Sequence, residues 1–163
     1  MRVQDVIDVE KNKNYFTQKF LLWPRTWQGG ASLPARTWET VPFAVDNADI
    51  VPNDVKAVYA FVLNVSIAGL DLQYLLYIGS TPKQSLQERY KDYIEEKRKV
   101  KRPHITVMLD KWPDNLLFRY SRIKDGEDPL DIETRLWEAF QPPLNRKKPR
   151  GQVKDSIDAW ARK

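Results

Sequence analysis

Glu133 is the residue of this chain that fits its position least, because it interrupts the apolar side of a predicted helix. The run from Pro129 to Phe140 has helical spacing, and at about 100° per residue its apolar side centres on this carboxylate. That side carries Leu136, Trp137 and Phe140. A carboxylate in such surroundings is stable when it is paired, protonated or bound to a metal ion. Glu133 is therefore either half of a structural ion pair or a metal ligand, and residues elsewhere must distinguish the two.

The composition restricts the chemistry that such a site could perform. The 163 residues include no cysteine and one histidine, His104, so disulfides, Cys/His zinc sites and thiol nucleophiles are excluded. A metal ion would be held by oxygen ligands, which favours magnesium, manganese or calcium. His104 itself follows a proline in a basic stretch and is expected in surface or loop structure.

The charge of the chain suits an acidic partner. The formal net charge is +5 and the pI is about 9.3, and basic residues gather in two runs, Lys97 to Arg102 and Arg146 to Arg150. Such runs can attract the phosphates of nucleic acid, or they can form a solvated face. Charge alone leaves both interpretations open.

Two strands and a helix are predicted ahead of the helix that carries Glu133. β-Branched and aromatic residues from Ala57 to Val65 and from Gln73 to Ile78 flank a short glycine-containing segment, which indicates an antiparallel hairpin. Ser85-Leu86-Gln87-Glu88 has the pattern of a capping box, so a helix is expected from there to about Lys99.

A third strand and the second helix complete the predicted fold. Apolar and polar residues alternate from Leu116 to Ile123, as in a half-buried strand. Asp128 and Pro129 then supply a cap and a first-turn proline. The order strand, strand, helix, strand, helix predicts an α+β fold, with a small three-stranded antiparallel sheet flanked by helices.

Residues 56–147 are expected to form this domain, between an irregular N-terminal arm (residues 1–55) and a basic C-terminal tail (residues 148–163). Four prolines in the arm argue against long helices. Its tryptophans, among them Trp27 and Trp38, could stack on nucleic-acid bases or pack on the core. The first residues have no leader pattern and no run is long enough to span a membrane, so a cytoplasmic protein without a membrane partner is expected.

Polar residues in an ordered series collect around the hairpin and the two helices. The series consists of Tyr59, Tyr77-Ile78-Gly79, Arg89 with Tyr93 one turn later, Glu133, and Asn145 after Pro142-Pro143-Leu144. This series resembles the GIY-YIG nuclease family. Ala57-Val58-Tyr59 matches the first family signature in altered form, Tyr77-Ile78-Gly79 matches the second intact, and the resemblance covers roughly residues 57 to 147.

The resemblance implies a metal-dependent DNA endonuclease that cuts or nicks phosphodiester bonds with Mg²⁺ or Mn²⁺. The catalytic residues implied are Tyr59, Tyr77, Arg89, Tyr93 and Glu133. Glu133 would be the metal ligand, Tyr93 would orient phosphate or water, and Gly79 and Asn145 would support the site. In the family the strand tyrosines activate or position the attacking water, which requires nearby positive charge to lower a tyrosine pKa from its usual value near 10.

Arg89 suits the negative charge that develops on the phosphoryl oxygens, because a guanidinium stays protonated and offers a planar set of donors. Its alternative role is a salt bridge to Asp92 or Glu96. Further DNA contacts are expected from basic residues nearby, with salt-dependent and largely sequence-independent affinity. These residues are Lys83, Lys97, Arg98, Lys101, Arg102, Arg146, Lys147, Lys148 and Arg150.

Two departures from the family pattern leave an alternative open. Ala57 replaces a glycine, and Ser80 occupies a position where the family often has a lysine, for which Lys83 is a weak substitute. The alternative is a catalytically weak or inactive DNA-binding protein of the same fold. For the endonuclease and for the inactive protein alike, the expected partner is duplex or branched DNA. The biological role would be in restriction, a mobile element, a phage or repair, and the protein would be a monomer or a homodimer.

Overall fold

The computed structural model describes residues 18, 20, 22 and 24–145, so the basic run from Arg146 and the C-terminal tail lie outside the described residues. In chain order the elements are α2 (Pro24–Ala31), β1 (Glu39–Pro42), the 3-10 helix η1 (Val45–Ile50), β2 (Ala57–Ile67), β3 (Leu70–Ser80), α3 (Leu86–Lys99), α4 (Pro103–Lys111), β4 (Leu116–Arg122) and α5 (Pro129–Phe140). The fold is α+β, as predicted. No helix in the described part of the chain is long and apolar enough to cross a membrane.

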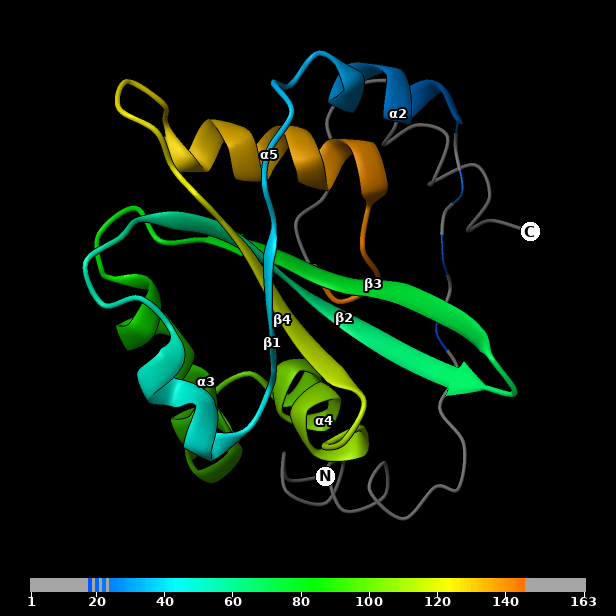
Figure 1. The fold of residues 1–163 in the computed structure, drawn as a ribbon, viewed down its shortest axis with the longest axis vertical. Coiled ribbons are helices and arrows are strands. Elements are labelled where there is room, and N and C mark those ends of the chain that lie inside the picture. Colours follow the sequence, from blue (N-terminus) through cyan, green and yellow to red (C-terminus); the bar gives the residue numbers. More distant parts are fainter. Residues whose placement is uncertain (1–17, 19, 21, 23, 146–163) are drawn as a thin grey trace.

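The sheet has four antiparallel strands in the order β1-β4-β2-β3, and not the three expected (Figure 1). The additional strand, β1, pairs with β4 and lies in the segment that was expected to be irregular. It is four residues long and ends at Pro42, which is tolerated because β1 is an edge strand. Val41, Phe43, Ala48 and Val51 are buried in the core, so part of the expected arm belongs to the domain.

The predicted hairpin is confirmed and is longer than expected. β2 and β3 pair from Val58 with Ser80 to Ile67 with Leu70, with a shift in register after Phe61. The turn between them consists of Ala68 and Gly69, which both have positive φ, 53° and 81°. Two successive residues of this kind form the tight turn that matches the twist of a hairpin. In the strand order of the sheet, β3 is an edge strand.

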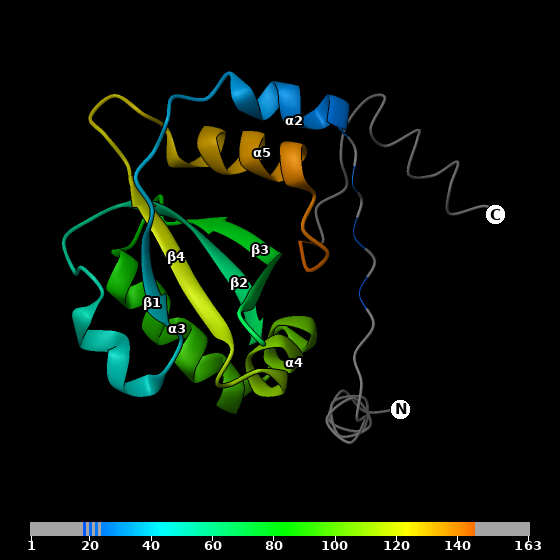
Figure 2. The ribbon, with the colours of Figure 1, turned by 45° about the vertical axis from the view of Figure 1, so that its right-hand side comes forward.

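The two faces of the sheet are covered by different helices (Figure 2). Tyr59 and Phe61 point into a core with α3 and α4, whereas Val58, Ala60 and Val62 point into a second core with α5. β2 is therefore buried on both sides, and this is why its sequence shows no polar alternation.

The two predicted helices begin and end close to the expected residues. Ser85 and Glu88 make both hydrogen bonds of the capping box at the start of α3, and the Asp128 side chain caps α5. Helix α4 was not predicted. His104 does not lie in a loop, because it is in the first turn of α4, where it is partly buried.

Candidate active site

Four of the predicted catalytic residues meet on the α3 face of the sheet. The hydroxyl oxygens of Tyr59 and Tyr93 lie 2.9 Å apart and share a hydrogen bond, and Arg89 Nε donates to the Tyr59 hydroxyl at 2.9 Å. The ring of Tyr77 lies 6.4 Å from the Tyr59 ring and 6.4 Å from the Tyr93 ring. We call Tyr59, Tyr77, Tyr93 and Arg89 the tyrosine–arginine cluster.

Burial divides the cluster into inner and outer members. Tyr59 and Tyr93 have no exposed surface, whereas Tyr77 is partly buried and the Arg89 side chain is 25% exposed. A ligand can therefore reach Tyr77 and Arg89 from solvent. Arg89 also lies 3.7 Å from Asp92, so the salt bridge considered as its alternative role is present alongside the bond to Tyr59.

The tyrosine hydroxyls of the cluster are weak acids. Burial raises the pKa of Tyr59 to about 12, Tyr77 adds to the rise, and Arg89 opposes it. Burial likewise raises the pKa of Tyr77 and of Tyr93 above the usual value. Arg89 therefore acts in the direction expected from the sequence, but burial outweighs it and the hydroxyls keep their protons at neutral pH.

Gly79 lies directly beneath the Tyr59 ring. A Cβ atom at residue 79 would come within 2.5 Å of Tyr59 Cζ and closer still to the hydroxyl oxygen. The glycine of the Tyr-Ile-Gly motif is thus needed because two parts of the hairpin approach closely, and not because of an unusual backbone angle.

Glu133 approaches the same hairpin from the other side of β3. It is 7% exposed, as its place on the apolar side of α5 predicts, although Phe140 on the same side is half exposed. The Ser80 hydroxyl donates to Glu133 Oε2 at 2.5 Å. The carboxylate thus contacts the residue that follows Gly79, at the position where the family often has lysine.

The donor atoms at this place fit a hard divalent cation only in part. Among the described residues, no three His, Cys, Asp or Glu side chains are grouped as a metal site. Glu133 offers carboxylate oxygen and Ser80 offers a hydroxyl. Magnesium keeps several waters and is commonly held by one or two carboxylates with a substrate phosphate, so one carboxylate is compatible with such an ion.

Asn145 binds the outer edge of β3. Its Oδ1 accepts from the Ile78 backbone N–H at 2.9 Å and its Nδ2 donates to the Ile78 carbonyl at 2.8 Å. Leu144 N–H also donates to the Leu76 carbonyl at 3.0 Å. The segment after α5 therefore covers the edge strand β3 beside Leu76 and Ile78.

The basic residues predicted to bind DNA have different surroundings. Lys83 and Lys101 are exposed. Lys97 pairs with Asp110 at 3.6 Å and Arg98 with Glu95 at 3.4 Å. Arg102 differs from these, because it pairs with the buried carboxylate of Glu96 and lies against the Tyr93 ring. Nothing in the sequence distinguished it from the rest of its run.

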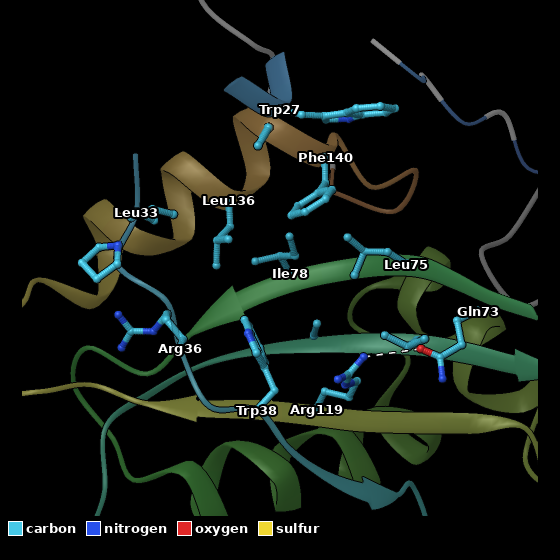
Figure 3. A pocket seen from close by; sticks show the side chains of 14 residues that line it. Trp27, Leu33, Arg36, Trp38, Gln73, Leu75, Ile78, Arg119, Leu136 and Phe140 are labelled. Carbon is cyan, nitrogen blue, oxygen red and sulfur yellow. Dashed lines mark hydrogen bonds between the residues drawn. The ribbon is translucent and has the colours of Figure 1, made fainter. Parts of the chain in front are cut away.

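A mostly apolar pocket of about 590 Å³ lies on the α5 face of the sheet, away from the tyrosine–arginine cluster (Figure 3). It was not foreseen. Its walls include Trp27, Trp38, Leu75, Leu136, Phe140 and Arg119, and Arg119 Nη1 donates to Gln73 Oε1 at 3.4 Å. Trp38 packs on the core, which was one of the two roles considered for the tryptophans of the N-terminal arm, the other being stacking on nucleic-acid bases.

The chain was also compared with known proteins. It matches no family model, no curated protein and no solved structure. Its function must therefore be inferred from the geometry of its own residues.

Proposed function

We propose that this protein is a metal-dependent DNA endonuclease of the GIY-YIG type, which hydrolyses phosphodiester bonds with Mg²⁺ or Mn²⁺. One observation carries the proposal. Three consecutive residues at the end of β3 are each contacted by a different member of the predicted series: Ile78 by Asn145, Gly79 by Tyr59, and Ser80 by Glu133. Residues far apart in the sequence thus contact one short stretch of strand, Tyr59 from the α3 face and Glu133 from the α5 face.

The accessible members of the site suit phosphoryl chemistry. Arg89 is partly exposed and its guanidinium carries a permanent charge, so it stabilises the negative charge that develops on the phosphoryl oxygens as water attacks. Tyr77 keeps its proton because burial raises its pKa, and it acts as a hydrogen-bond donor to the phosphate or the water. Tyr59 and Tyr93 are too deeply buried to contact a substrate, so they position Arg89.

The carboxylate of Glu133 would hold the divalent cation, with water and a substrate phosphate as the other ligands. When bound, such an ion supplies charge neutralisation and a more acidic water. Ser80 donates to the carboxylate and fixes its orientation, as a group one step removed from a metal commonly does.

The test is nicking of supercoiled plasmid with Mg²⁺ or Mn²⁺. We expect the native protein to nick, Glu133→Gln and Glu133→Ala to lose the activity, and Asp131→Asn to keep it. Asp131 is the matched control because it is an exposed acid of the same helix. Equal cleavage by the native protein and Glu133→Ala would show that Glu133 is not the metal ligand or that the activity is a contaminant.

The second candidate is a DNA-binding protein of the same fold that does not cut. It is favoured by the complete burial of Tyr59 and Tyr93, which keeps two of the residues implied to be catalytic away from a substrate. Retained DNA binding without nicking under any divalent cation would establish this function and exclude the endonuclease.

A further inference from the structure

Two guanidinium groups lie close to the buried ring of Tyr93. The Cζ atom of Arg89 lies 5.0 Å from the ring centroid and that of Arg102 lies 4.9 Å from it. Arg89 belongs to α3, whereas Arg102 lies between α3 and α4. The chain changes direction at Val100, which has a left-handed backbone with φ 47° that a β-branched residue rarely adopts, so the surrounding structure fixes the turn that brings Arg102 to the ring.

Arg102 is held in place by a buried acid. Glu96 is 5% exposed and accepts from the Arg102 backbone N–H and from Arg102 Nε, the latter at 3.2 Å. A guanidinium has five N–H donors, and Glu96 uses one of them. A side chain fixed in this way loses little conformational entropy when it binds a ligand.

Arg89 and Arg102 line the same pocket, which has a volume of about 360 Å³. Its other walls are Asp92, Glu95, Glu96, Lys99 and Lys101. Each acid already has a cationic partner: Asp92 has Arg89, Glu96 has Arg102, and Glu95 has Arg98 and Lys99. Four of the seven lining residues are basic and three are acidic, so the balance is positive.

The partly buried state of the two arginines separates them from Arg98. The Arg89 and Arg102 side chains are 25% and 30% exposed, whereas the Arg98 side chain is 78% exposed. Cations that are partly removed from water interact more strongly with an anion than fully solvated ones. Burial raises the pKa of Tyr77 and Tyr93, and both arginines oppose this rise, which places Arg102 within electrostatic range of the site.

We propose that Arg89 and Arg102 together bind one phosphate group of the DNA backbone, so that Arg102 is a second phosphate-binding residue beside the predicted catalytic arginine. Two planar donor sets that line one pocket suit a tetrahedral oxyanion. The identity of the ligand as DNA rests on the proposed function. Lys97 and Arg98, which do not line this pocket, contribute only diffuse attraction.

The test compares Arg102→Ala and Arg102→Lys with Arg98→Ala, which removes the same charge from the same run. Affinity for a short DNA duplex is measured by fluorescence anisotropy in EDTA at fixed salt, so that cleavage plays no part. We expect Arg102→Ala to weaken binding by about 10-fold to 100-fold, as loss of a charge-assisted hydrogen bond does, Arg102→Lys to weaken it less, and Arg98→Ala to change it by less than about 3-fold. Equal losses for Arg102→Ala and Arg98→Ala overturn the proposal.

A second measurement on the unaltered protein does not depend on any variant folding. The Nε–Hε NMR signals of Arg89 and Arg102 are followed during titration with inorganic phosphate and then with the duplex. Both signals should move with each ligand while the Arg98 signal stays in place. Movement with phosphate alone overturns the assignment to DNA, and no movement of the Arg102 signal overturns the site.

These outcomes are distinguishable from failure of the proposed function. If the native protein binds duplex through the two arginines but never nicks plasmid, the phosphate site stands and the endonuclease falls. If it nicks plasmid while Arg102→Ala binds duplex as the native protein does, the endonuclease stands and the phosphate site falls.

Discussion

Gly79→Ala tests the closest approach in the candidate site. The new Cβ would lie within 2.5 Å of Tyr59 Cζ, a separation far inside van der Waals contact. Tyr59 cannot move away freely, because its ring stacks on Phe118 with 5.2 Å between centroids and its hydroxyl is bonded to Tyr93 and Arg89. The substitution must therefore displace Tyr59, the strand, or both.

The size of the effect follows from two opposing terms. Overpacking of a well-filled core costs about 1–3 kcal/mol. Replacement of glycine by alanine also reduces the entropy of the unfolded chain, which contributes about 0.4–1 kcal/mol of stability. We expect the free energy of unfolding to fall by on the order of 1–2 kcal/mol, with a decrease in melting temperature of about 2–4 °C per kcal/mol.

The assay is urea unfolding of Gly79→Ala alone and combined with Tyr59→Leu. In the Tyr59→Leu background the added methyl group has room, so the loss should disappear and the coupling energy should reach about 1 kcal/mol or more. Gly126→Ala is the control: Gly126 has φ +83° and a Cβ added there would meet nothing within 4 Å, so its cost of about 1 kcal/mol should be the same in both backgrounds. A Gly79→Ala protein as stable as the native one would refute the steric reasoning.

Three further predictions concern the contacts around this glycine. Tyr59→Phe removes the hydroxyl that accepts from Arg89 and is shared with Tyr93, so urea unfolding should show a loss of about 1–3 kcal/mol; no loss would mean that these bonds do not stabilise the fold. Asn145→Ala removes both side-chain bonds to Ile78, so hydrogen exchange of the Ile78 amide should accelerate by about 10-fold or more, and an unchanged rate would contradict the edge-strand contact. Alkaline pH should destabilise the protein, because burial raises the pKa of Tyr59 to about 12 and also raises the pKa of Tyr77 and of Tyr93, so that above about pH 10 the unfolded state loses these protons first. Tyr59 alone should contribute a fall in stability of about 1.4 kcal/mol per pH unit between about pH 10 and 12, so the fall should be shallower by that amount in Tyr59→Phe. Equal stability at about pH 9 and pH 11 would contradict the burial argument.

The parts of the fold that the sequence predicts are those with local signals. The capping box at Ser85 and the aspartate and proline before α5 mark helix starts through contacts between near neighbours. The hairpin is marked by two β-branched runs around a glycine. In each case the free energy that decides the local structure comes from residues a few positions apart.

The structural features that the sequence did not predict either depend on residues distant in the chain or lack a regular spacing of apolar residues. β1 is a strand because β4 lies beside it, and nothing between Glu39 and Pro42 announces this pairing. α4 is buried over five consecutive residues, Ile105 to Leu109, so its sequence has no amphipathic pattern to detect. The position of Arg102 depends on the backbone turn at Val100. The surrounding run of basic residues contains no local signal for that turn.

The contact between Ser80 and Glu133 is compatible with a metal ligand at residue 133. A lysine at this position beside Glu133 would place a positive charge next to the proposed metal ligand and compete with a divalent cation for it. A serine hydroxyl donates to the carboxylate at 2.5 Å without bringing a charge, so it can orient the ligand and leave its attraction for a cation intact. In the proposed endonuclease, the positive charge offered to a phosphate would come instead from Arg89, which is held by Tyr59. The departure at residue 80 therefore changes how charge is distributed at the site, and it does not by itself argue for an inactive protein.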